Sequence, residues 1–440
     1  MKGINIYLGV ILVCCLVGIP AYSQPLAQNN IPIERISRLQ CSGTAMPYAY
    51  QPRKQSAPPA GYSPFYINHV GRHGARYLSS ASKITPVLKI LHSAKQQNRL
   101  TARGAEIDSF LTELSVLSED RWGELTALGK EEQRNIARRM ITNYPAVFDP
   151  VRGDSMTIFS ISTNVHRCIE SMESFIAELK SLNPTLIIHS ESGTKFDSIL
   201  RFFDCNPAYN AYKERGEWEN VYNSFVHQNS SVAQVQKSLF IPGFAVSNDS
   251  LIDFSNKLFQ IYAILPDMDI EFPMEDIFPI QDARRFWENN NLRQYLLKGP
   301  STIGQGLPVD IAAPLLEDFL ITAQQAIETD GICADIRFAH AETLIPFAAL
   351  LGIPQASARI DNLRQVAASW QDFGIAPMAA NIQWIFYRND SNEIIVKVLL
   401  NEQEVFLPVT SDIQPYYRWK ELYTYYKRMV DALYQKDRIR

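Results

Sequence analysis

Three short apolar runs, each followed by a helical pattern, constrain the fold of this chain most strongly. The runs are 64–70, 157–162 and 334–339, and each has the length and residue types of a buried strand. The helical stretches that follow are 79–100, 167–182 and the residues up to Gly352. Alternation of strand and helix is typical of an α/β fold, so we predict a core sheet flanked by helices.

The helix expected at 167–182 illustrates the pattern. Its apolar positions Ile169, Met172, Ile176 and Leu179 recur at intervals of three and four residues. Thr163 or Asn164 precedes it, and either side chain can cap the first turn. We therefore expect one face of this helix to pack on the sheet.

The rest of the chain consists of segments that differ in composition. Residues 24–62 are polar and proline-bearing and are expected to run along the surface. Residues 197–302 contain aromatic residues in helical patterns without clear strands, which indicates an inserted, mostly helical domain. Near the end, 382–387 and 393–400 predict a hairpin, and 415–440 predicts a terminal helix. The predicted divisions are a signal peptide (1–23), a lead segment (24–62), a first α/β core segment (63–196), the helical insertion (197–302) and a second α/β core segment (303–440).

The first residues resemble a cleaved export signal. Lys2 is followed by the apolar run 4–19 and by a small-residue site, Ala21 to Ser23. The run is shorter than the roughly 20 residues of a membrane-spanning helix. A lipid anchor at Cys14 is disfavoured because Val13 precedes it. We expect export to a periplasm or to the medium, and no stable membrane span.

Charge and cysteine content limit the partners. The chain has 42 Lys and Arg against 46 Asp and Glu, a net charge of -4, which argues against a nucleic-acid partner. Without 1–23 four cysteines remain, Cys41, Cys168, Cys205 and Cys333, which permit up to two disulfides in three connectivities. No Cys/His spacing indicates a zinc site, so no metal is expected. The sequence leaves the oligomeric state open.

Charged and ionisable residues follow each of the three predicted strands. They are Arg72, His73 and Arg76 after the first, Arg167 after the second, and His340 and Glu342 after the third. Ligand sites of open α/β sheets lie beyond the carboxyl ends of the strands, so these side chains are expected to converge.

This set of residue types suits phosphoryl transfer. Guanidinium groups bind phosphate oxygens through paired, charge-assisted hydrogen bonds. A neutral His73 ring nitrogen can attack phosphorus, and Gly71 and Gly74 permit close approach to an anion. Glu342 is the carboxyl group placed to protonate the leaving oxygen.

The alternatives are structural. A single histidine after a strand is more often a structural residue, and Arg167 alone would be an exposed helix residue. The run from Arg72 to Arg76 fixes four residue types, which chance produces about once per 160,000 positions, whereas His340 to Glu342 alone is weak. Lys195 and Arg201 could contact outer phosphates, although a solvated surface is the commoner role of such residues.

At these residues the sequence resembles the histidine acid phosphatases, specifically the multiple inositol-polyphosphate phosphatase (phytase-like) branch. The matching segments are 72–76, 123–129, 166–168, 200–204 and 338–346. The resemblance implies an α/β core with an inserted helical domain and no metal cofactor. It implies His73 as nucleophile, Glu342 as proton donor, and Arg72, Arg76, Arg167 and His340 as phosphate binders.

The sequence departs from the family pattern at two positions. Leu78 stands where proline is usual, and Ala75 stands where this branch often has threonine. These differences bear on fine specificity. The resulting hypothesis is an exported enzyme that hydrolyses inositol hexakisphosphate and lower inositol phosphates through a phosphohistidine. A broad-specificity acid phosphatase, a mutase-like transferase and a non-catalytic phosphate-binding module are the alternatives.

Overall fold

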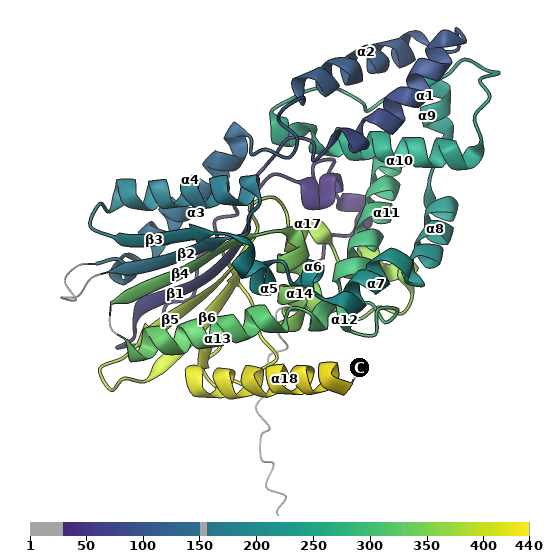
Figure 1. The fold of residues 1–440 in the computed structure, drawn as a ribbon. Helices are drawn as coiled ribbons and strands as arrows, with labels where there is room; N and C mark the ends of the chain where they lie inside the picture. The colour runs from purple at the N-terminus through teal and green to yellow at the C-terminus, as the bar shows by residue number, and fades with distance from the viewer. Residues whose placement is uncertain (1–29, 150–155, 330, 440) are drawn as a thin grey trace, which may run out of the picture.

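A mixed β-sheet with helices on both faces organises the computed structural model, which describes residues 30–149, 156–329 and 331–439 (Figure 1). The strands are β1 (Ser63–Arg72), β2 (Thr157–Ser162), β3 (Ile187–Ser192), β4 (Ile332–Ala339), β5 (Asn381–Arg388), β6 (Ile394–Leu400), β7 (Gln403–Glu404) and β8 (Tyr416–Arg418). Their order is β3-β2-β4-β1-β5-β6-β7, with β8 paired to β6. Pairing is parallel from β3 to β1 and antiparallel from β1 to β7, so the α/β prediction is confirmed.

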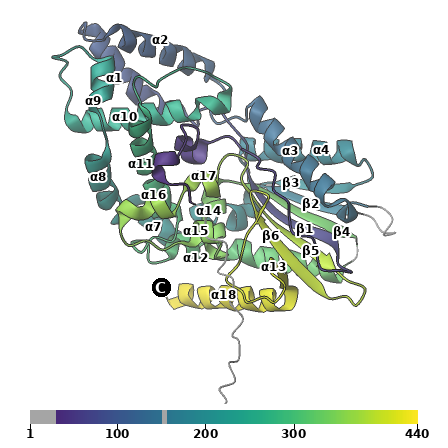
Figure 2. The same cartoon turned by 180° about the vertical axis from the view of Figure 1, so that it is seen from behind.

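Each face of the sheet is covered by a pair of helices (Figures 1 and 2). Helices α3 (Ala127–Asn143) and α4 (His166–Leu182) cover one face, and α13 (Ala313–Glu328) and α18 (Trp419–Ile439) cover the other. Phe175 of α4 packs in one core with Ile336, whereas Phe319 of α13 packs against Trp384. Because β1 is buried on both faces over most of its length, its side chains reach both cores.

A helical region lies beside the sheet. It contains α1 (Thr85–Gln96), α2 (Ala102–Leu117), α8 (Trp218–Asn229), α9 (Ala233–Leu239), α10 (Asn248–Ile264) and α11 (Ile280–Lys298). Leu91 and Leu111 share an apolar core with Leu258 and Phe286, so α1 and α2 pack with helices from the 197–302 stretch. The division at 197 and 302 remains a proposal.

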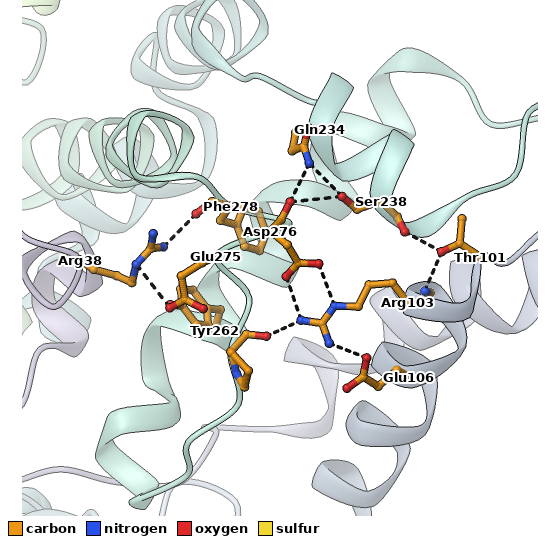
Figure 3. A network of polar contacts seen from close by, with 12 residues as sticks. Arg38, Thr101, Arg103, Glu106, Gln234, Ser238, Tyr262, Glu275, Asp276 and Phe278 are labelled. Atoms are coloured by element: carbon orange, nitrogen blue, oxygen red, sulfur yellow. Dashed lines mark hydrogen bonds and ion pairs between the residues drawn. The ribbon is translucent and has the colours of Figure 1, made fainter.

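Polar contacts join the loops of this region (Figure 3). The Arg103 guanidinium of α2 donates to both carboxylate oxygens of Asp276 at 3.0 Å and to Glu106 at 2.7 Å. Arg38, from the lead segment, donates to the Phe278 carbonyl at 2.8 Å. These contacts hold α2 and the lead segment against the chain that enters α11.

Several predicted elements are confirmed with shifted ends. The hairpin is β5 and β6, and α14 (Ala341–Leu350) follows the third strand and ends before Gly352, whose φ is +72°. In α4 the buried face is Cys168, Met172, Phe175 and Leu179, so Ile169 and Ile176 lie at its margin and not at its centre. The expected end of the chain is also revised, because Tyr416–Arg418 pairs with β6 as β8 and the helix begins at Trp419.

Two predictions at helix starts were wrong. The helix expected from Ser79 begins at Thr85, with Pro86 in its first turn. Neither Thr163 nor Asn164 caps α4, since Val165 occupies that position and makes no side-chain cap. The edge strand β3 was missed because most of its residues are exposed and show no apolar alternation.

Part of the lead segment is buried in the protein core. Ile36 and Cys41 are buried in the core of the helical region, although the sequence predicts a surface path for residues 24–62. A short 3₁₀ helix, Gln40–Ala45, carries Cys41 inward. The apolar residues within this polar segment are therefore part of the fold.

The four cysteines in the described portion of the chain are unpaired. Cys41, Cys168 and Cys333 are buried, and Cys205 is exposed. The two disulfides that the sequence permits do not form in this structure. Within the described residues, no helix is long and apolar enough to cross a membrane, and the predicted signal at 1–23 lies outside them.

Candidate active site

Strand register brings the predicted site residues together. In the parallel pair of β1 and β4, Arg72 lies opposite Ala339, and in the pair of β2 and β4, Ser162 lies opposite Phe338. The His73 N–H then donates to the Ala339 carbonyl at 3.1 Å. The carboxyl ends of β1, β2 and β4 therefore lie side by side, and the residues that follow these three strands start there.

His73 is held in a defined tautomer. Its Nδ1 lies 2.9 Å from the Gly74 carbonyl oxygen, which can only accept, so Nδ1 carries the hydrogen and donates it. Nε2 then keeps its lone pair. Burial, followed by the charge of Arg72 and then of Arg167, lowers the pKa of His73 well below its usual value. This shift favours the neutral ring, whose Nε2 lone pair is free.

The three predicted arginines present unused donors. The Nε of Arg72, of Arg76 and of Arg167 is buried and has no hydrogen-bond partner among the described residues. Arg72 is itself anchored, because its Nη1 donates to the carbonyls of Thr44 and of Ala376, the latter at 2.9 Å. Unsatisfied buried N–H groups are costly. Their clustering indicates a site for an anion.

The arginines also repel one another. Burial, and then the charges of Arg167 and Arg72, lower the pKa of Arg76 to about 10. Desolvation similarly lowers the pKa of Arg72. A bound polyanion would relieve this crowding, and so the arrangement favours an anionic ligand.

His340 lies beside His73, with ring centroids 5.7 Å apart. Its Nε2 is 3.2 Å from Thr163 Oγ1. Burial and then Arg167 lower the pKa of His340 to about 3. His340 is therefore neutral and can donate one ring N–H to a bound oxygen.

Glu342, in the first turn of α14, forms an ion pair that the sequence did not predict. Lys298 Nζ, at the end of α11, lies 2.8 Å from Glu342 Oε1. The lysine side chain is only 9% exposed, whereas the Glu342 side chain is 41% exposed. Desolvation raises the pKa of Glu342, but the charge and the hydrogen bond of Lys298 hold this pKa far below its usual value. The carboxyl group is thus ionised before substrate binds.

Two further buried carboxyl groups lie near the arginines. Asp267 is fully buried and makes no hydrogen bond of normal geometry among the described residues. Burial, with Glu132 adding to it, raises the pKa of Asp267 well above its usual value despite the opposing charge of Arg76. Glu132 of α3 accepts from the N–H groups of Ala75 at 2.7 Å and of Tyr48 at 2.6 Å. Glu132 therefore holds the loop that carries His73.

Glycines allow the loop after β1 to approach α3. A Cβ at Gly74 would lie 2.3 Å from the Gly129 carbonyl oxygen, and one at Gly129 would lie 2.1 Å from the Ala75 carbonyl oxygen. Gly123 has a φ of +75°, which favours glycine, and it lies in contact range of the Arg167 guanidinium, since a Cβ there would be 3.4 Å from Nη1. The 123–129 segment thus packs closely against the loop that carries His73.

The two possible outer contacts differ. The Arg201 Cζ atom lies 5.6 Å from the centroid of the Phe203 ring, and the ring centroids of Phe203 and His340 are 6.0 Å apart. Arg201 therefore lies at the margin of the site. Arg201 also pairs with Asp204 at 2.5 Å. Lys195 pairs with Glu191 and is 59% exposed, so the structure does not group it with the other predicted residues.

The sequence missed Lys298, Asp267 and Glu132. Lys298 precedes Gly299 at a helix end, where lysine is ordinary, and no motif marks the two acids. Their roles depend on tertiary contacts alone. Within the described residues, no group of three or more His, Cys, Asp or Glu side chains could hold a metal ion.

Comparisons with known proteins identify the family of the chain. Residues 66–401 match the model of the histidine phosphatase superfamily (branch 2). The chain is 24% identical over 390 residues to multiple inositol polyphosphate phosphatase 1 of Gallus gallus, covering 84% of this chain and 82% of that protein. The Homo sapiens protein of the same name is 23% identical over 405 residues, covering 82% and 78%.

Solved structures share the fold. The Bifidobacterium longum multiple inositol polyphosphate phosphatase complexed with inositol hexasulfate matches with a TM-score of 0.77 and 23% identity, over 87% of this chain and 96% of that one. The phytase from D. castellii matches with a TM-score of 0.64 and 17% identity, over 95% and 90%.

Proposed function

The chain belongs to the histidine phosphatase superfamily, branch 2, and from this premise we propose that it is an exported enzyme that hydrolyses inositol polyphosphates. The substrates would be inositol hexakisphosphate and its lower phosphates. The buried Nε donors of Arg72, Arg76 and Arg167, unused beside a neutral His73, are the observation that carries the proposal. The relatives named above support this substrate class.

The proposed reaction has two steps. His73 Nε2 attacks phosphorus, the ester P–O bond breaks, and Glu342 donates a proton to the leaving oxygen. A water molecule then attacks phosphorus, the P–Nε2 bond breaks, and Glu342 accepts the proton of that water. The arginines stabilise the charge on the peripheral oxygens in both steps.

A substrate with several phosphates needs cations beyond the reacting centre. Arg201 at the margin and Lys298 beside Glu342 provide two, and they come from different segments of the chain. Net charge does not oppose this binding, because a local cluster of cations sets the field at the site.

The test is separation of inositol phosphate products over time, with no metal added. We expect stepwise loss of phosphate from inositol hexakisphosphate by the native protein and none by His73→Ala. Full phosphate release by that variant would contradict the nucleophile. If kcat/KM for a simple sugar phosphate equalled that for inositol hexakisphosphate, the protein would instead be a broad-specificity phosphatase.

A further inference from the structure

The ion pair between Lys298 and Glu342 poses a chemical problem. Glu342 must carry a proton in order to protonate a leaving oxygen, yet a buried ammonium 2.8 Å away keeps it ionised before substrate binds. The proposed proton donor, Glu342, is therefore in direct contact with Lys298, the cation that keeps it ionised.

Lys298 is placed to exchange partners. Its side chain is nearly buried at the end of α11, and among the described residues Glu342 is its ion-pair partner. The positive charges of Arg293 and Arg72 act on it as well, so it belongs to the same cation cluster as the candidate phosphate binder Arg72. A phosphate dianion entering this cluster would offer the ammonium a more highly charged partner than one carboxylate.

We propose that Lys298 is a positioning residue for the proton donor: it pairs with Glu342 until substrate binds, and a bound substrate phosphate then takes over its ammonium group. The inference rests on the proposed function and deepens it. Glu342 would then act as an acid only when substrate is present.

Each proton in the proposed exchange has a source and a destination. When the ammonium turns to phosphate, Glu342 loses a cation and gains an anionic neighbour, so it takes up one proton from solvent, to which it is 41% exposed. That proton passes to the leaving oxygen as the P–O bond breaks. Glu342 is then a carboxylate again and can accept the proton of the attacking water.

Replacing Lys298 alone leaves the other charged and titratable groups around the Lys298–Glu342 ion pair in place. Those that act electrostatically on Glu342 or Lys298 are His340, Arg72, Arg76, Arg293, Tyr209 and Asp372. A change in pH profile on replacing Lys298 alone is therefore attributable to the lysine.

The experiment compares pH profiles of kcat/KM, which reports the free enzyme, with those of kcat, which reports the complex. Inositol hexakisphosphate and glycerol phosphate serve as substrates, because both have alkyl leaving groups that need a proton. In the native enzyme we expect the alkaline limb to lie at higher pH in kcat than in kcat/KM.

Lys298→Met should move the alkaline limb of kcat/KM up by about one pH unit or more, since a carboxyl group loses an adjacent cation. Its KM should rise several-fold, and the kcat limb should move less. Lys298→Arg should retain the native profile. Glu342→Gln should abolish the limb, which identifies the group that titrates.

Lys397→Met is the matched control. Lys397 of β6 is 2% exposed and pairs with Glu404 of β7 at 3.2 Å, so its loss also removes a buried lysine from an ion pair. This control should lower the melting temperature without moving either limb. An unmoved kcat/KM limb in Lys298→Met, or an equal shift in Lys397→Met, would overturn the proposal. Failure of the native protein to hydrolyse inositol hexakisphosphate would instead refute the proposed substrate, and glycerol phosphate would still test Lys298.

Discussion

At the scale of single residues, the site is built from groups whose charge state is set by their neighbours. His73 is neutral because burial and adjacent arginines disfavour a second ring proton. Glu342 is ionised because Lys298 lies against it. At about pH 4, residue type alone would assign a protonated histidine and a half-protonated glutamate, since these residues ordinarily titrate near pH 6.5 and pH 4.3.

Glu132 should make stability depend on pH. Burial raises its pKa from 4.5 to about 7, despite hydrogen bonds from Tyr48 and Ala75. The folded protein therefore keeps a proton that the unfolded chain has already released. This contribution is present in full below about pH 4.5 and is lost as pH rises through about 7.

Replacing Glu132 with Gln should flatten this dependence. We expect the native protein to lose on the order of 3 kcal/mol more of its unfolding free energy than Glu132→Gln between about pH 5 and about pH 8. Urea denaturation at both pH values measures it. Burial raises the pKa of Asp372 to about 6. This residue therefore contributes to the pH dependence of the unfolding free energy in both proteins. Parallel slopes would show that Glu132 does not titrate in this range.

At the scale of elements, close backbone packing positions His73, the proposed nucleophile. Helix α3 begins at Ala127 against the loop that carries His73, and this is possible because Gly129 has no side chain. Glu132, one turn later, accepts from the same loop. One helix end therefore supports the reactive ring through a contact and a hydrogen bond.

Gly129→Ala should damage both stability and turnover. The added methyl group would lie 2.1 Å from the Ala75 carbonyl oxygen, so the helix or the loop must move. We expect a loss of about 1–3 kcal/mol of unfolding free energy, as for other overpacked sites, and a lower kcat. Gly374→Ala is the control, because nothing lies within 4 Å of its added methyl group. Native-like kcat in Gly129→Ala would mean that His73 does not depend on this contact.

At the scale of the whole molecule, the site lies where the sheet and the helical region meet. Arg72 and His340 follow strands of the sheet, whereas Lys298 and Asp267 come from the helical region. The lead segment joins them by offering the Thr44 carbonyl to Arg72. Both regions are therefore needed to complete the site.

Intact mass measurement tests export and thiol state together. We expect the exported protein to begin at Gln24, as the pattern at 1–23 predicts. Alkylation of the folded protein should label the exposed Cys205, and alkylation after denaturation without reductant should label all four cysteines, because none is paired. Fewer labels after denaturation would reveal disulfides, and an intact residue 1–23 segment would contradict cleavage.

The sequence by itself determined the α/β class, the three strand ends and the residues that follow them. Those signals are local, since an apolar run and the motif after it stand next to each other in the chain. Only tertiary structure decided that Lys298 faces Glu342, that Thr44 holds Arg72 and that Thr163 contacts His340 instead of capping a helix. These contacts join residues distant in sequence, and a lysine at a helix end or a backbone carbonyl carries no mark of its partner. The candidate site residues were thus readable from the chain, whereas their charge states depend on how the fold packs them.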